Sequence, residues 1–153
     1  MKKMLLNGAW KLEIPGTSYG IVSANVPGSV YHDLYSANLM PDPFYRDNEM
    51  QALALMDNDF HYSRSFCVDQ ALLDSDAVYL RCEGLDTIAT VYVNGEIVGL
   101  ANNMHRIWEF DIKSLLKPGE NRIEIRFSSP LRYLANCPER NLGGSQRDAV
   151  AGY

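Results

Sequence analysis

The chain has 153 residues, and its 14 Lys and Arg against 19 Asp and Glu give a formal net charge of −5. This length is typical of one domain, and a hydrophobic content of 46% is that of a folded globular protein and excludes a disordered chain. We expect no nucleic-acid partner. Phosphate binding depends on clustered Lys and Arg, and this acidic chain has no basic run.

Neither a membrane span nor an export signal is evident in the sequence. No segment approaches the ~20 apolar residues that cross a bilayer, so we expect no membrane partner. Lys2 and Lys3 resemble the start of a signal peptide, but Asn7 interrupts the apolar residues that follow, so we expect a cytoplasmic protein. The three cysteines are odd in number and widely spaced, which predicts reduced structural residues.

The first third of the chain predicts two strands, one helix and a long connection. Residues 10–14 and 19–26 are predicted strands on either side of a Pro-Gly turn. Ser29 is a predicted N-cap for a short helix over residues 30–37. Residues 40–59 are rich in Asp, Asn and Pro and are predicted as a connection. Loops longer than ~12 residues are usually functional or disordered.

From Phe60 onward, large apolar residues recur at every second position, which predicts half-buried strands. Asn94-Gly95 lies between two of them and indicates a hairpin, because a type I′ turn needs positive φ at both central residues. Residues 111–116 predict about one helical turn. The sequence therefore predicts an all-β fold, with antiparallel strands in a sandwich over residues 60–68, 77–83, 87–93, 96–98, 107–112 and 122–128.

Two side chains on these strands are predicted to be structural. Arg64 shares a strand face with Tyr62 and Phe66, and a lone Arg on an apolar face is costly unless it is paired. We expect Arg64 to bond a carboxylate or a carbonyl within the fold, the alternative being contact with a ligand. Trp108 is expected to lie in the core beside Phe110.

The sequence lacks the patterns of several catalytic classes. It has no Gly-x-Ser-x-Gly elbow and no glycine-rich loop of the Rossmann or Walker type. The histidines His32, His61 and His105 do not have the spacing of metal ligands. We therefore expect neither a metal nor a cofactor.

A series of short segments in a fixed order carries a family resemblance. They are VPGSVYHDL at residues 26–34, MPDPFYRDNE at 40–49, YSRSF at 62–66, EGLDT at 83–87, VNG at 93–95, NNMHR at 102–106 and FSSP at 127–130. Together they resemble the N-terminal domain of β-mannosidases of glycoside hydrolase family two. The EGLDT and hairpin segments are shared with β-galactosidases and β-glucuronidases, whereas PDPFY with DNE narrows the resemblance to β-mannosidases.

This resemblance implies a galactose-binding-like jelly-roll β-sandwich with one short helix. It also implies that a later (β/α)8 barrel supplies the Glu acid/base and the Glu nucleophile, so no catalytic residue is expected here. We expect an N-terminal fragment, with the sandwich domain over residues 1–135 and a linker to downstream domains over residues 136–153. The full-length parent is expected to hydrolyse terminal non-reducing β-D-mannose residues of manno-oligosaccharides with retention.

The resemblance also implies site candidates. In relatives, the loop before the Tyr-x-Arg-x-Phe strand reaches toward the barrel mouth. Asn48 is the leading candidate for a substrate-facing contact, followed by Asp47, Glu49 and Arg46. A carboxamide both donates and accepts hydrogen bonds, which suits orienting a sugar hydroxyl but not transferring a proton. The other interpretation is that these residues only seat the loop against the next domain.

Three alternatives to this function remain. An autonomous carbohydrate-binding module is suggested by Trp10, Trp108 and nine tyrosines, whose rings could stack on sugars. A second alternative is the same domain of another family-two glycosidase, of the β-galactosidase or β-glucuronidase type. The third is a purely structural dimerisation domain.

Overall fold

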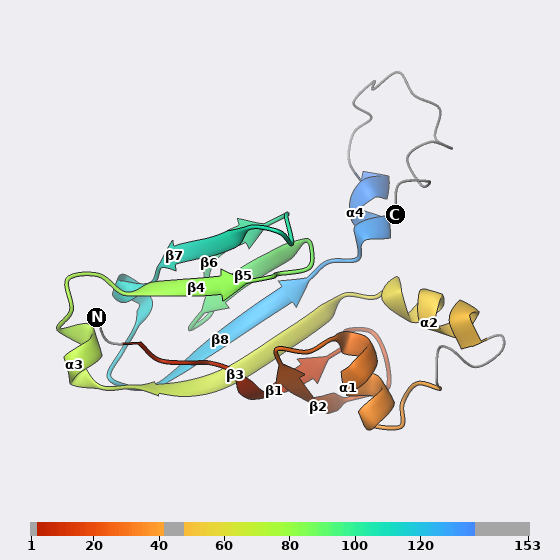
Figure 1. Cartoon of the computed structure of the whole chain (residues 1–153), viewed down its shortest axis with the longest axis horizontal. Coiled ribbons are helices and arrows are strands. Elements are labelled where there is room, and N and C mark those ends of the chain that lie inside the picture. Colours follow the sequence, from red (N-terminus) through yellow and green to blue (C-terminus); the bar gives the residue numbers. More distant parts are fainter. Residues whose placement is uncertain (1–2, 42–47, 137–153) are drawn as a thin grey trace, which may run out of the picture.

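In the computed structural model, which describes residues 3–41 and 48–136, the strands form two antiparallel sheets (Figure 1). The larger sheet has six strands in the order β2-β1-β3-β8-β5-β6, and the smaller sheet pairs β4 with β7. The predicted all-β sandwich is confirmed. Its strands are β1 (Gly8–Glu13), β2 (Ile21–Val26), β3 (Phe60–Val68), β4 (Tyr79–Glu83), β5 (Ala89–Val93), β6 (Glu96–Ala101), β7 (Ile107–Asp111) and β8 (Gly119–Phe127).

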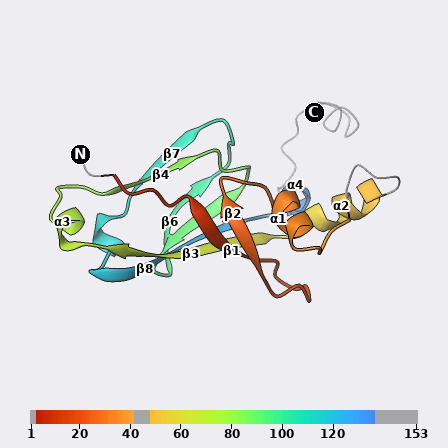
Figure 2. The ribbon, with the colours of Figure 1, turned by 60° about the horizontal axis from the view of Figure 1, so that its bottom comes forward.

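The core lies between the two sheets. At the centre of the larger sheet β3 pairs with β8, from Phe60 opposite Phe127 to Val68 opposite Gly119. Successive side chains of a strand point to opposite faces, so one apolar face of this sheet turns inward, under β4 and β7 (Figures 1 and 2). The ring of Phe110 lies directly on Gly99 of β6, where a Cβ atom would overlap it. Gly99 therefore permits the two layers to approach closely.

Helix α1 (Val30–Ser36) packs against β2 at one end of the sandwich. Ser29 is its N-cap, as the sequence predicts: the Ser29 hydroxyl accepts a hydrogen bond from the amide of His32 at 3.3 Å. Leu34 is fully buried in the core. Burying a leucine side chain stabilises a fold by roughly 1.5–3 kcal/mol, so Leu34 anchors the helix to the sheet.

The structure holds more helix than the sequence predicts. The prediction of a connection over residues 40–59 is wrong for α2 (Asn48–Met56), which buries Ala52 and Leu55, three residues apart on one face. A further helix, α4 (Pro130–Asn136), begins at a proline, which lacks the amide that would be unpaired at that position. Burial of Ala52 and Leu55 in the hydrophobic core accounts for α2, and the local start signal accounts for α4.

The remaining helical elements are short. Helix α3 (Gln70–Leu73) is capped by Asp69, whose side chain accepts from the amide of Leu72. The 3-10 turn η1 (Lys113–Leu115) lies where the sequence predicts one helical turn. Within residues 3–41 and 48–136, no helix is long and apolar enough to span a membrane.

Candidate functional site

The predicted substrate-facing residues fall at the start of α2. Asn48 and Glu49 are the first two residues of this helix, whereas Arg46 and Asp47 lie outside the described residues. Helices α1, α2 and α4 gather at the same end of the sandwich in both ribbon views (Figures 1 and 2). This end of the molecule, which we call the helical end, carries the candidate site.

A polar cluster holds the C-terminal end of α2 to the start of α4. The Ser129 hydroxyl donates to Oδ1 of Asp57 at 3.0 Å, and the Ser129 amide donates to Oδ1 of Asp59 at 2.9 Å. The Arg132 guanidinium donates to the Asp57 carbonyl at 2.7 and 3.0 Å and lies 3.3 Å from Oδ1 of Asp59. We call these four residues the clasp. No local pattern in the sequence predicts the clasp, because its two halves are about seventy positions apart in the chain.

A buried Asp–Tyr pair ties α1 to the sheet. Asp33 is buried, and its two carboxylate oxygens accept hydrogen bonds from the Asn25 amide at 3.1 Å and from the Tyr62 hydroxyl at 3.0 Å. Burial, and then the neighbouring Asp33 carboxylate, raise the pKa of Tyr62 far above its usual value. Tyr62 therefore stays protonated and acts as the donor. The sequence places Tyr62 on the buried face but does not identify its partner.

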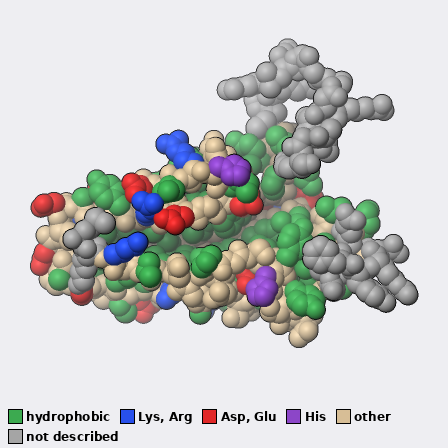
Figure 3. All heavy atoms as spheres, in the orientation of Figure 1, with side chains coloured by type: hydrophobic (Ala, Val, Ile, Leu, Met, Phe, Trp, Pro, Cys, Tyr) green, Lys and Arg blue, Asp and Glu red, His purple; other side chains and the backbone are tan. Residues whose placement is uncertain are grey.

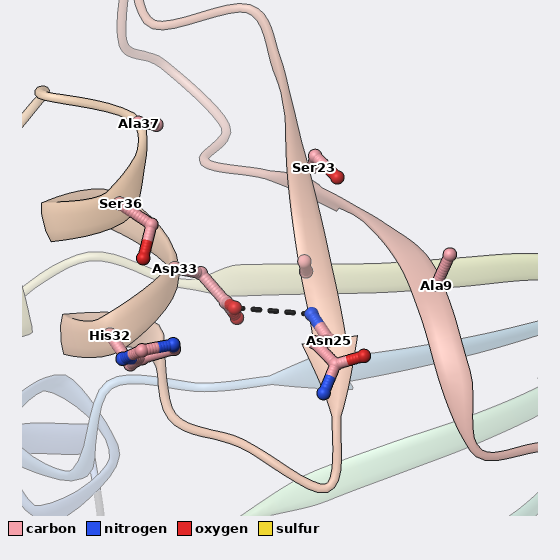
Figure 4. Close-up of a pocket in the computed structure, with 8 residues that line it drawn as sticks. Ala9, Ser23, Asn25, His32, Asp33, Ser36 and Ala37 are labelled. Carbon is pink, nitrogen blue, oxygen red and sulfur yellow. Dashed lines mark hydrogen bonds between the residues drawn. The ribbon is translucent and has the colours of Figure 1, made fainter.

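A shallow pocket of about 290 Å³ lies between α1 and the β1–β2 strands, and Figure 4 shows Asp33 pointing from the helix toward Asn25. Hydroxyl, amide and imidazole groups give it hydrogen-bonding capacity. Each oxygen of the Asp33 carboxylate accepts a hydrogen bond from within the fold, and these bonds hold α1 to the sheet. The lining residues are Ala9, Ser23, Ala24, Asn25, His32, Asp33, Ser36 and Ala37.

Arg64 crosses a gap between β1 and β3. The two strands pair only from Lys11 to Glu13, so they separate toward the start of β1. Arg64 Nη1 donates to the carbonyls of Leu6 at 3.0 Å and Asn7 at 2.6 Å. These bonds fasten the N-terminal segment to β3. A hollow of about 530 Å³ borders the same separation.

Asn94 and Gly95 form the β5–β6 turn, with φ angles of 52° and 87°. Asn94 Nδ2 donates to the Leu115 carbonyl and to Oδ1 of Asn121, both at 2.8 Å. Its own Oδ1 accepts from the Arg122 amide at 2.9 Å. The turn is thereby bonded to η1 and to β8 itself.

The two tryptophans differ in exposure. Trp10 is 6% exposed, and its indole nitrogen donates to the Leu6 carbonyl at 2.7 Å. Trp108 is half-buried and stacks on Phe110, with ring centroids 6.3 Å apart and an angle of 6° between the planes. The Arg106 guanidinium lies 4.7 Å from the centre of the Trp108 ring. The Trp10 ring is therefore not available to stack on a sugar.

No group of three or more His, Cys, Asp or Glu in the described ranges, 3–41 and 48–136, could hold a metal ion. Cys67 is exposed and Cys82 is buried, and both are free thiols; Cys137 lies outside the described residues. Burial raises the pKa of the Cys82 thiol to about 11, so the nucleophilic thiolate is scarce at neutral pH. The helical end can thus hold polar groups in place, but the described residues assemble no nucleophile or metal centre there.

Comparison with known proteins finds one family. A family model described as glycosyl hydrolase 2 galactose-binding domain-like matches residues 10–148. The β-mannosidase of Capra hircus is 33% identical over 136 residues, which cover 89% of this chain and 15% of that protein. The β-mannosidase of Bos taurus gives the same values. The chain therefore spans about 15% of the length of these curated relatives.

Solved structures share the fold. The β-D-mannosidase from Dictyoglomus thermophilum superposes with a TM-score of 0.84 and 36% identity, covering 91% of this chain and 18% of that one. A β-D-glucuronidase from the same organism superposes with a TM-score of 0.60 and 22% identity, covering 81% of this chain and 19% of that one. The second likeness shows the fold alone.

Proposed function

Because the chain belongs to the glycosyl hydrolase 2 galactose-binding domain-like family, we propose that it is a non-catalytic β-sandwich domain of a β-mannosidase. The full-length parent would hydrolyse terminal non-reducing β-D-mannose residues of manno-oligosaccharides. It would do so with retention, by a pair of Glu residues that lie in another domain. The domain would cover residues 1–135, with a connection to downstream domains over residues 136–153.

One observation carries the choice of β-mannosidase over other family-two glycosidases. Similarity to the Dictyoglomus thermophilum β-D-mannosidase extends over 91% of the chain at 36% identity, whereas similarity to the glucuronidase of that organism is 22%. The two enzymes share the fold, but this chain is more similar in sequence to the β-D-mannosidase. The curated β-mannosidases at 33% identity point the same way.

We assign this domain the role of packing on the catalytic domain and shaping the rim of the active site. Asn48 at the start of α2 is the leading candidate to contact substrate, with Asp47, Glu49 and Arg46 beside it in sequence. Its place at the start of a helix at the helical end supports this role. We expect the protein to act in the cytoplasm.

Turnover by the full-length protein tests the proposal. We expect it to hydrolyse an aryl β-mannoside in preference to the matching β-galactoside and β-glucuronide, and the 153-residue chain to hydrolyse none of them. A preference for the galactoside or the glucuronide would reassign the parent. Turnover by the purified 153-residue chain would overturn the non-catalytic role.

The alternative of an autonomous carbohydrate-binding module has less support, because Trp10 is buried and Trp108 is stacked on Phe110. Calorimetry of the 153-residue chain with mannose and mannobiose distinguishes the two functions. We expect no heat of binding at millimolar sugar. A dissociation constant of about 1 mM or tighter would favour the module.

A further inference from the structure

Two helices at the helical end expose leucine and methionine side chains to solvent. On α2, Met50 and Leu53 are 71% and 55% exposed, and on α4, Leu131 and Leu134 are 63% and 66% exposed. Each pair is three residues apart and so lies on one face of its helix. The space-filling view shows hydrophobic side chains gathered at this end of the molecule (Figure 3). We call these four residues the α2–α4 face.

Helix α4 is held in place without a core of its own. None of its residues is buried, and a helix of seven residues is marginal in water. The clasp nevertheless orients it: the Ser129 hydroxyl accepts from the Arg132 amide at 3.4 Å while Arg132 bonds the Asp57 carbonyl. A helix that is held in place while its leucines stay exposed presents an apolar surface of the kind that binds a partner.

The direction of the chain indicates what covers this face. The polypeptide leaves the sandwich through α4, whose exposed leucines are the last large aliphatic side chains of the described residues. The curated relatives carry some 85% of their length outside the part that this chain matches. A segment continuing from α4 is tethered beside the face at high effective concentration, an advantage that a separate protein lacks.

We propose that the α2–α4 face is the surface on which the following part of the same polypeptide docks. This rests on the proposed function in one respect, that the chain is one domain of a longer glycoside hydrolase. The clasp then sets the angle at which the two parts meet, because it fixes α4 relative to α2. Docking would bring the start of α2, with Asn48, against the following domain.

The test compares the full-length protein with the 153-residue chain. The triple variant Leu53→Gln, Leu131→Gln and Leu134→Gln removes the apolar surface and keeps side chains that favour helix. We expect it to lower the Tm of the full-length protein by about 5–10 °C and to leave the 153-residue chain within about 2 °C of wild type. Amides of α4 should be protected from hydrogen exchange in the full-length protein and lose that protection in the variant.

The control is the double variant Ile97→Thr and Leu100→Thr. These two β6 side chains are 63% and 68% exposed, so they match the α2–α4 face in exposure. We expect this double variant to leave the Tm of the full-length protein unchanged. An equal loss of Tm in the control and the triple variant would overturn the proposal, because the effect would not be specific to the face.

Two further outcomes would overturn it. One is a triple variant that unfolds like wild type in the full-length protein. The other is a wild-type 153-residue chain that dimerises in ultracentrifugation while the triple variant stays monomeric, since the occupant would then be a second copy. Hydrolysis of β-mannosides does not enter these readouts, so an inactive full-length protein with a lowered Tm would refute the proposed function and leave the docking surface standing.

Discussion

Asn94 and Asn121 face each other through their side-chain amides, with Asn94 Nδ2 donating to Asn121 Oδ1 at 2.8 Å. Asn121 is almost fully buried, so the hydrogen bonds of its side-chain amide are made within the fold. Its Nδ2 donates to the carbonyls of Lys117 and Gly119, and its Oδ1 also accepts from the Lys117 amide. The pair therefore connects the β5–β6 turn to the turn before β8.

Replacing Asn121 by Ala should destabilise the domain strongly. The change removes the acceptor of the Lys117 amide and one of the two acceptors of Asn94 Nδ2, and it takes the side-chain donor away from the Lys117 and Gly119 carbonyls. An unsatisfied buried polar group costs about 1–3 kcal/mol. We expect the free energy of unfolding to fall by roughly 2–4 kcal/mol, measured by urea denaturation followed by circular dichroism. The exposed Asn102→Ala variant is the control and should stay within about 0.5 kcal/mol of wild type. A small effect at Asn121 would contradict the role we give to this pair.

The hydrogen bond from Tyr62 to Asp33 predicts how stability depends on pH. The pKa of Tyr62 is raised in the folded state, so its contribution is fully present below pH 10 and is lost as pH rises above the unfolded value. Each pH unit above 10 should cost about 1.4 kcal/mol. Wild type should therefore lose stability between pH 9 and pH 11, and the Tyr62→Phe variant should lose less, because it lacks the contribution from Tyr62 ionisation.

At neutral pH, the same Tyr62→Phe variant leaves one Asp33 oxygen without its buried donor. We expect a loss of roughly 1.5–3 kcal/mol, since the acceptor is a carboxylate. The exposed Tyr79 provides the matched control: Tyr79→Phe should keep the wild-type stability at pH 7. If Tyr62→Phe and wild type lost stability equally between pH 9 and pH 11, the raised pKa would be refuted.

Arg64 should hold the N-terminal segment onto β3. The Arg64→Met variant keeps the apolar stem but removes the donors to the Leu6 and Asn7 carbonyls. We expect faster hydrogen exchange over residues 6–10 and a free energy of unfolding lower by roughly 1–3 kcal/mol. Arg64→Lys should recover part of the loss, because an ammonium group can still reach one carbonyl. Unchanged exchange over residues 6–10 in Arg64→Met would rule out this anchoring role.

Asn48 should affect substrate binding in the full-length protein. The Asn48→Ala variant removes a carboxamide that can donate to and accept from one sugar hydroxyl. We expect a fall in kcat/KM of about tenfold, which corresponds to the loss of roughly 1.4 kcal/mol, in a variant that still folds. A fall in Tm without a fall in kcat/KM would instead favour the interpretation that Asn48 only seats its loop against the next domain.

Local sequence signals account for most of the strands and for the β5–β6 turn. The alternation of apolar residues places Tyr62, Ile123 and Ile125 on the buried face of the sheet. The tight turn requires positive φ angles, which Asn94 and Gly95 adopt. The pattern of apolar residues does not predict helix α2. Its apolar residues do not form one stripe, since Met50 and Leu53 are exposed while Ala52 and Leu55 are buried. Tertiary packing in the hydrophobic core selects the buried pair.

In the candidate site, too, some features are predicted from local sequence and others depend on contacts between distant segments. The segment around Asn48 is marked in the sequence by its family resemblance, and Ser29 is marked as a cap by its place before a helix. The contact from Tyr62 to Asp33 joins residues 29 positions apart, and that from Ser129 to Asp57 joins residues 72 positions apart. Periodicity reports which face of a segment is buried but carries no information on the partner it meets. Strand order, the clasp and the α2–α4 face therefore arise only when distant segments pack together.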